Sequence, residues 1–521
     1  MGHSTISLPM IGLAVAMVFA TTVRAQPTVV YEDAKVVASD AQAFDYFGNP
    51  FTYVPPPTIP ESGTTVAIDG EVMVVGAHGD DDLGSYSGSV YVFRFDGVTW
   101  IEEQKLTASD GVAGDKFGST VALDGDVLVV GSTLNDSPGT ESGAAYVFRH
   151  NGAIWIEEQK LTASDAVAGE HFGWAVDICD DVILIGADWD DDAGDYSGSA
   201  YIFRHDGVTW VEEQKLVASD AATSHVFGYS VAICGDVAVV GAPYDDTLLV
   251  NAGSAYIYRL VGATWVEEQK ISADDPASED LFARSIDLDG DRIVVGSPLC
   301  ERPPLNLAGA AYVYEYSGGS WDQTARLEPM SIATGDLHGF SVRVSGDTLL
   351  VCSRNTDFVA PGTGSGVIYL HNGVGWVETK RLLASDAAQL DVMGVSAAMD
   401  GDVIVLAAGL EDDGGTDAGA VYVFGSITTP YVRGEINGDG TVDISDGVFL
   451  LAALFIPGAP PSTCLDASDV NDDGANDVSD AVYLLGWLFI SGAEPPAPFP
   501  NCGNDASPDP QDCAEYLGTC P

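Results

Sequence analysis

The stretch Trp-Ile-Glu-Glu-Gln-Lys-Leu at residues 100–106 occurs again at residues 155–161 and, with Val in place of Ile, at residues 210–216. Looser copies begin at Trp265, Trp321 and Trp376. Successive copies are 55, 55, 55, 56 and 55 residues apart, as the differences between tryptophan numbers 100, 155, 210, 265, 321 and 376 show. A fixed period of this kind is typical of solenoids, arrays and propellers. The sequence therefore predicts a fold built from repeated modules.

Each period contains four short apolar runs separated by turn residues. In the second period these runs begin at Phe117, Val127 and Gly143, and the fourth is the stretch at residues 155–161. Runs rich in β-branched and aromatic residues, bounded by Asp-Gly or Asn-Gly pairs, are typical of antiparallel hairpins. Four strands in a period of this length indicate one blade of a β-propeller.

The number of blades follows from the turn after the first strand of each repeat. This turn recurs seven times, at Asp69-Gly70, Asp124-Gly125, Asp180-Asp181, Gly235-Asp236, Asp289-Gly290, Gly346-Asp347 and Asp400-Gly401. The seventh repeat ends at Phe424 without a tryptophan strand, whereas residues 34–40 match the end of the missing strand as it occurs at residues 104–110. We expect the N-terminal strand to complete blade seven, because ring closure removes exposed strand edges. The predicted fold is an all-β, seven-bladed propeller over residues 34–425.

The N-terminus has the pattern of an export signal. Residues 6–20 are apolar but too few for a membrane span, and Val23-Arg24-Ala25 is a small-x-small cleavage pattern. We expect a signal peptide at residues 1–25, cleavage after Ala25 and a short segment at residues 26–33; an uncleaved anchor is the alternative. No later apolar run reaches spanning length, so we expect a secreted or cell-surface protein with no membrane span in the mature chain.

The charge of the chain is strongly negative, with 78 acidic and 20 basic residues and a net charge of -58. This charge disfavours nucleic acid and anionic membranes as partners. Acidic residues gather between the second and third strands of blades one, three and seven, at Asp80, Asp81, Asp82, Asp188, Asp190, Asp191, Asp192, Asp195, Glu411, Asp412, Asp413 and Asp417. Strand alternation places these loops on the same face as the connections between blades. That face is either a docking face for cations or a basic ligand, or a solvated rim.

Blade four carries the signatures of a known repeat. Phe227-Gly228, Gly241-Ala242-Pro243 and the run at residues 253–258 resemble the FG-GAP repeat of integrin α chains, and the resemblance extends over all seven periods. Blades five, six and seven depart from it at Phe282-Ala283, His338-Gly339 and Met393-Gly394. Integrin-type blades often have a calcium loop between the first two strands. Here that place is a tight turn with too few oxygen ligands, so calcium is not expected in the blades.

Two related twelve-residue segments follow the propeller, at residues 435–446 and 469–480, and an apolar stretch follows each. Oxygen-bearing residues at positions one, three, five, seven, nine and twelve have the spacing of a calcium loop, with a backbone carbonyl at seven and glycine at six. The first set is Glu435, Asn437, Asp439, Thr441, Asp443 and Asp446, and the second is Asp469, Asn471, Asp473, Ala475, Asp477 and Asp480. The sequence therefore predicts two Ca2+ sites in a small α-helical domain with paired, EF-hand-like loops.

This doubled motif resembles a type I dockerin over residues 435–490, joined to the propeller by a linker at residues 426–434. The resemblance implies docking onto a cohesin-like protein through the helix faces. A cysteine-containing tail at residues 491–521 is not part of that pattern.

The eight cysteines fall into two groups. Four gather near the C-terminus, at Cys464, Cys502, Cys513 and Cys520, and we expect them to form two disulfides with three pairings left open. The other four, Cys179, Cys234, Cys300 and Cys352, are expected to remain free.

The sequence favours binding over catalysis, because no nucleophile motif is present and no carboxylate pair is fixed by its context. We expect an exported binding or adhesion protein whose propeller is a recognition scaffold for an unknown protein or glycan ligand. The alternatives are a secreted polysaccharide hydrolase carrying a dockerin and a structural cell-surface protein. A Pro-rich insert at residues 49–61 is either a binding element or an ornament of blade one.

Overall fold

The computed structural model describes residues 27–49, 64–301, 304–425, 433–434, 436–437, 442–456, 465–471, 476–490, 493, 495–496 and 499. The predicted signal peptide, residues 50–61 of the insert, linker residues 426–432 and the four C-terminal cysteines lie outside the described residues.

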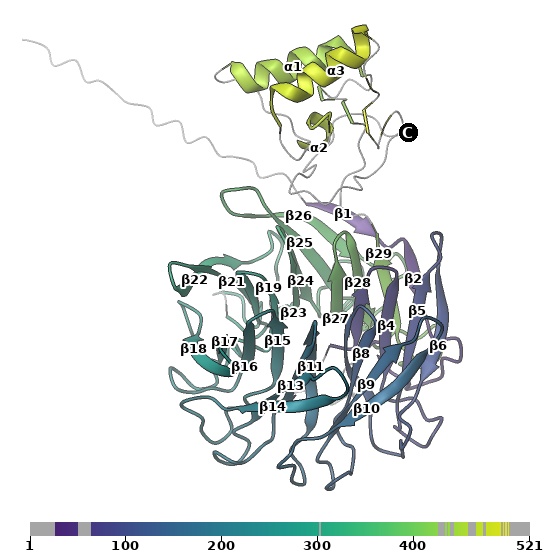
Figure 1. Cartoon of the computed structure of the whole chain (residues 1–521), viewed down its shortest axis with the longest axis vertical. Coiled ribbons are helices and arrows are strands. Elements are labelled where there is room, and N and C mark those ends of the chain that lie inside the picture. Colours follow the sequence, from purple (N-terminus) through teal and green to yellow (C-terminus); the bar gives the residue numbers. More distant parts are fainter. Residues whose placement is uncertain are drawn as a thin grey trace, which may run out of the picture.

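Seven sheets form the propeller, and each sheet is one blade (Figure 1). Blade one contains β3 (Val66–Asp69), β4 (Val72–Ala77), β5 (Ser89–Phe95) and β6 (Trp100–Leu106). Blade two contains β7 (Phe117–Asp124), β8 (Val127–Ser132), β9 (Ala144–His150) and β10 (Trp155–Leu161). Blade three contains β11 (Phe172–Cys179), β12 (Val182–Ala187), β13 (Ser199–His205) and β14 (Trp210–Leu216). Blade four contains β15 (Ser230–Cys234), β16 (Val237–Ala242), β17 (Ser254–Val261) and β18 (Thr264–Ile271).

The remaining three blades have the same antiparallel order. Blade five contains β19 (Ser285–Asp289), β20 (Arg292–Ser297), β21 (Ala310–Ser317) and β22 (Ser320–Leu327). Blade six contains β23 (His338–Ser345), β24 (Thr348–Ser353), β25 (Ser365–His371) and β26 (Trp376–Leu383). Blade seven contains β27 (Met393–Asp400), β28 (Val403–Ala408), β29 (Ala420–Phe424) and the N-terminal β2 (Ala34–Val36). The seven-bladed prediction is confirmed.

The ring closes through the N-terminal strand, as the sequence predicts. β2 pairs antiparallel with β29, with Ala34 opposite Val423 and Val36 opposite Val421. The sequence did not predict β1 (Thr28–Tyr31), which pairs parallel with β26 and makes blade six five-stranded. Residues 28–31, within the short segment that precedes the predicted propeller, thus belong to the sheet of blade six.

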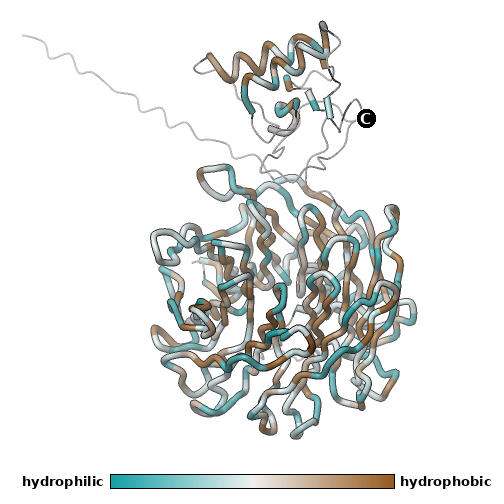
Figure 2. Tube along the Cα trace, viewed as in Figure 1, coloured by the Kyte–Doolittle hydropathy of each residue, from teal (hydrophilic) through white to brown (hydrophobic). Residues whose placement is uncertain are grey.

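The hydrophobic core lies between neighbouring blades. One cluster joins Val92 and Leu106 of blade one to Phe117 and Tyr146 of blade two, all buried. The ring of Phe117 packs edge-on against Tyr146 at 5.4 Å, a geometry that aromatic pairs favour. Figure 2 shows hydrophobic colour along the strands and hydrophilic colour in many of the loops that join them.

The glycine of the Phe-Gly signature has a steric cause. Gly118 has φ +85°, and an added Cβ would lie 2.4 Å from the carbonyl oxygen of Ser89. Only a residue without a side chain fits both the conformation and this close approach. In blade six His338 replaces the phenylalanine, and its buried ring bonds to Ser353 Oγ (2.7 Å) and to Tyr369. Burial lowers the pKa of His338 to about 3, so this histidine is a neutral core residue.

The two helices expected after the calcium-type loops are present. They are α1 (Ile444–Phe455) and α3 (Val478–Ile490), and α2 (Leu465–Ser468) is a single short turn. Leu450 of α1 and Leu484 of α3 share a small apolar core. Within the described part of the chain, no helix combines the length and the apolar character needed to cross a bilayer.

Candidate functional site

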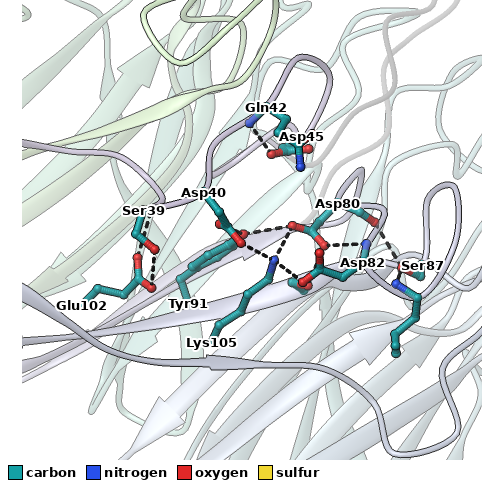
Figure 3. Close-up of polar contacts among 12 residues, drawn as sticks. Ser39, Asp40, Gln42, Asp45, Asp80, Asp82, Ser87, Tyr91, Glu102 and Lys105 are labelled. Carbon is teal, nitrogen blue, oxygen red and sulfur yellow. Dashed lines mark hydrogen bonds and ion pairs between the residues drawn. The ribbon is translucent and has the colours of Figure 1, made fainter.

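The acidic loops and the connections between blades lie on the same face of the propeller, here called the connection face. Lys105, from the repeated stretch on β6, lies among three carboxylates of this face (Figure 3). Its Nζ is 2.8 Å from Asp40, 2.8 Å from Asp80 and 2.7 Å from Asp82. The hydroxyl of Tyr91 on β5 donates hydrogen bonds to Asp40 (2.7 Å) and Asp80 (2.9 Å).

The same arrangement recurs around the ring. Equivalent lysines bind equivalent acceptors in blades two, three, four and seven: Lys160 with Asp110 and Asn135, Lys215 with Asp165, Asp190 and Asp192, Lys270 with Asp220, Asp245 and Thr247, and Lys35 with Asp386, Glu411 and Asp413. Each lysine also lies over the ring of a tyrosine in the third strand, at 5.0 to 5.5 Å from the ring centroid. We call these groups the lysine clusters.

Hydrogen bonding keeps both partners of a lysine cluster charged. Burial alone would lower the pKa of Lys105, but its hydrogen bonds to three aspartates raise that pKa overall. Burial alone would raise the pKa of Asp245, but hydrogen bonds from Lys270, Thr247 and Tyr256 lower it to about 2. The ammonium group of Lys105 and the carboxylate group of Asp245 are therefore held as ions.

Asp40, Asp80 and Asp82 also meet a geometric condition for a metal site, because one oxygen of each lies within 4.8 Å of the others. A calcium ion needs six or more oxygen ligands at about 2.3 to 2.6 Å. Here the lysine ammonium already lies within hydrogen-bond distance of all three carboxylates, and a metal ion would have to displace it. These residues therefore fit an internal ion pair better than a metal site.

A different site lies on the connection face between blades three and four. It is an open cavity of about 510 Å³, and its walls are mostly aromatic. The lining residues are His171, Trp174, Asp188, Trp189, Tyr196, Ser224, Val226, Tyr229 and Tyr244. We call it the aromatic pocket.

The rings of the aromatic pocket form a continuous series of contacts. His171 stacks on Trp189 with centroids 4.1 Å apart and lies parallel to Trp174 at 5.8 Å. Trp189 meets Tyr196 edge-on at 5.0 Å, and both side chains are substantially exposed, by 40% and 48%. Exposed aromatic faces in a concave site are a common feature of ligand pockets.

Polar groups also line the aromatic pocket. The Asp188 carboxylate is buried, with its Oδ1 3.6 Å from Nδ1 of His171. Trp174 is also buried, and its indole N–H has no hydrogen-bond partner among the described residues. The pocket thus combines apolar ring faces with an acidic group and an available donor.

The residues of the aromatic pocket do not repeat along the chain, so the repeat pattern does not predict the pocket. The residue after the Phe-Gly signature differs in each blade and is Asn49, Ser119, Trp174, Tyr229, Arg284, Phe340 or Val395 in order. Comparing the repeats at this position would have shown large aromatics in consecutive blades three and four.

The C-terminal loops are described in part. Of the twelve predicted calcium ligands, the described ones are Asn437, Asp443, Asp446, Asp469, Asn471, Asp477 and Asp480, while Glu435, Asp439, Thr441, Asp473 and Ala475 lie outside the described residues. Asp446 is buried and accepts the backbone N–H groups of Asn437 (3.1 Å) and Asp443 (2.9 Å). The second loop has the same bonds, from Asn471 (3.2 Å) and Asp477 (2.8 Å) to Asp480. The two loops therefore share one local structure.

The fold and the repeated side chains define a class, that of β-propellers made of seven FG-GAP blades. The family model described as "FG-GAP repeat" matches residues 61–93, 100–148, 155–203, 210–258, 265–314, 321–371 and 376–424. The chain belongs to this family. It is also similar to human integrin alpha-11, with 26% identity over 183 residues. That similarity covers 31% of this chain and only 14% of the integrin. The family match covers the propeller and does not extend to the C-terminal loops.

The lysine clusters predict unequal effects of two matched substitutions. Lys215→Met should lower the free energy of unfolding by about 3 to 5 kcal/mol, because it removes the ammonium group that lies 2.7 Å from the buried carboxyl group of Asp190. Lys160→Met should cost only about 1 kcal/mol, because Asn135 is neutral and Asp110 is half exposed. Chemical denaturation of the two variants measures the difference, and equal losses would contradict the role assigned to the buried carboxylate.

The lowered pKa of Asp245 predicts a loss of stability in acid. Because this pKa is about 2 in the folded chain and about 4 in an unfolded one, the stabilisation is complete above pH 4 and is lost as the pH falls to 2. The difference in unfolding free energy between the parent protein and Asp245→Asn should therefore shrink by about 2 kcal/mol over that interval. In a Lys270→Met background the shrinkage should be much smaller, and an undiminished effect there would show that Lys270 is not its cause.

Proposed function

We propose that this chain is an exported binding protein with two attachment sites. The propeller holds a ligand in the aromatic pocket of its connection face, and the C-terminal loops bind calcium and attach the chain to a second, cohesin-like protein. The observation that carries the first part is the aromatic pocket, where exposed rings break the repeat and gather in one cavity. Membership of a family that includes integrin-like propellers supports a scaffold role.

A ligand with a positively charged group suits the aromatic pocket best. The faces of tryptophan and tyrosine attract cations through their negative quadrupole. Asp188 adds a carboxylate to the lining, and the net charge of -58 raises the local concentration of cations. A lysine or arginine side chain of a partner protein has both the charge and the apolar stem that such a site accommodates. A sugar ring stacked on Trp189 is the alternative ligand.

The ligand class can be tested on the full chain with three small probes. N-acetyl-arginine amide should quench tryptophan fluorescence at concentrations roughly tenfold lower than its neutral isostere, N-acetyl-citrulline amide, because only the former carries a charge. Trp189→Ala should abolish this response, whereas Val374→Ala, at a fully solvated position, should leave it unchanged. Binding of a glucose tetrasaccharide in place of the arginine probe would instead identify a glycan site. Absence of binding by all three probes would refute the pocket as a ligand site.

The second part of the proposal concerns calcium in the C-terminal loops. Buried Asp446 and Asp480 close the two loops in the same way, and each loop then leads into a helix of one shared core. Asp443 begins α1 as its cap, accepting the N–H of Ser445 at 2.7 Å. The carboxylate-rich donor set fits a hard cation, which would neutralise the repulsion between neighbouring aspartates. Helices α1 and α3, ordered by the bound ion, would then present the surface that contacts the cohesin-like protein.

Calcium titration of the full chain by calorimetry tests this second part. We expect two sites in the parent protein and their loss in Asp439→Asn/Asp473→Asn, because these changes remove a carboxylate from position five of each loop. The control Asp96→Asn/Asp206→Asn removes two charges from exposed propeller turns and should leave both sites intact. Binding that persists in the loop variant would place calcium elsewhere in the chain.

The two alternatives from the sequence are a polysaccharide hydrolase and a structural surface protein. No specific feature of the described residues favours either of them over the binding role.

A further inference from the structure

The turns between first and second strands form a ring on the face opposite the connection face, here called the turn face. In several blades the last residue of the first strand reaches the turn of the next blade. Asp69 Oδ2 accepts the N–H of Gly125 at 2.6 Å, and Asp289 Oδ2 accepts that of Gly346 at 2.7 Å. Successive turns are thus close enough for one side chain to span the seam.

Two consecutive places in this ring are occupied by cysteine. Cys179 ends β11 of blade three, and Cys234 ends β15 of blade four. Cys179 Sγ accepts the N–H of Gly235, the residue that follows Cys234, at 3.3 Å. Both cysteines are partly exposed, whereas Cys300 and Cys352 are buried.

We propose that Cys179 and Cys234 form a disulfide that joins blades three and four when the chain meets a small-molecule or protein disulfide as oxidant. The two sulfurs are not bonded in the structure, but the turns that carry them are in contact. The Gly235 nitrogen that touches Cys179 Sγ is bonded directly to the carbonyl carbon of Cys234. Disulfides require Cα atoms roughly 4.4 to 6.8 Å apart, so the cross-link needs the two turns to lie against each other, as the contact between Cys179 and Gly235 shows that they do.

The chemistry of the pair assigns a role to each thiol. The hydrogen bond from Cys179 lowers the pKa of Cys234 to about 6 and raises the pKa of Cys179. Cys234 is therefore the thiolate that attacks the oxidant disulfide, forming a mixed disulfide and expelling one thiolate. Cys179 then loses its proton and attacks the Cys234 sulfur, expelling the second thiolate. Two protons and two electrons pass from the cysteines to the oxidant, which ends as two thiols.

The cross-link would act on the strands that carry the aromatic pocket. β11 runs from Trp174 near one end to Cys179 at the other, and β15 runs from the residue after Tyr229 to Cys234. A disulfide between the turn-face ends of these strands would restrain the seam between blades three and four. The aromatic pocket lies at the opposite end of that seam. The inference does not depend on which ligand the pocket holds.

Peptide mapping of the full chain tests the disulfide. The native protein is equilibrated with oxidised glutathione, alkylated and digested with trypsin, which places the cysteines on separate peptides, residues 161–204 and 216–259. We expect these two peptides to be joined, and to separate after reduction. Joining should raise the Tm by roughly 5 °C, because the bond closes a loop of about 55 residues.

Matched variants exclude other causes. Cys179→Ser and Cys234→Ser should each abolish the joined peptide and the part of the Tm shift that depends on oxidation, whereas Cys352→Ser should leave both unchanged. A folded protein in which both thiols are alkylated, or in which each carries glutathione separately, would overturn the proposal. A joined peptide without any change in Tm would confirm the bond and overturn its stabilising role.

Discussion

The propeller depends on side chains that join the outer edge of one blade to the next, because neighbouring blades cannot pair there strand to strand. Gln104 donates to the carbonyl of Trp155 (3.0 Å) and accepts its N–H (2.9 Å), so one amide side chain substitutes for a neighbouring strand. The next three seams carry the same clamp, formed by Gln159, Gln214 and Gln269. Partly buried backbone groups at each edge are thereby satisfied. In blade six Lys380 stands at the glutamine position, and there the backbone of β1 pairs with the edge instead.

Two different side chains of each repeated stretch therefore make two different kinds of contact. Its glutamine joins the blades, and its lysine compensates the carboxylates that enter the connection face from two loops. A β-bulge between Glu157 and Gln159 changes which side chains face each way, so that both tasks fit on one short strand. Blade five lacks the lysine, and Arg326 contacts Asp275 and Cys300 in its place. Some of the acidic residues are consequently part of the internal bonding of the propeller, and an acidic loop does not in itself indicate a metal site.

Much of the architecture could be predicted from the sequence, because period and turn residues are local signals. The turns at Gly70 and its equivalents gave the number of blades, and the match between residues 34–40 and 104–110 gave the closure. β1 could not be predicted, since its four residues resemble no repeat and pair with a strand some 350 positions away. The lysine clusters were missed for a similar reason: Asp40 and Lys105 are far apart in sequence, and acidic residues alone suggested an open face. The aromatic pocket was not predicted because its residues do not repeat, whereas the prediction rested on residues that do.

A repeated scaffold can acquire a particular function at the positions where its residues differ from the repeat. In this ring the repeated residues already satisfy the seams and neutralise the buried charge, so their replacement would cost stability. The residue after Phe-Gly is not fixed by the repeat, and it varies from Ser119 to Trp174 and Tyr229 in consecutive blades. The last residue of the first strand is also variable, and there the same two blades carry cysteine. The ring sets the spacing of β11 and β15. The residues that depart from the repeat at both ends of these two strands therefore face each other across a single seam. The seam between blades three and four is therefore a place where aromatic residues at one end and cysteines at the other depart from the repeat together.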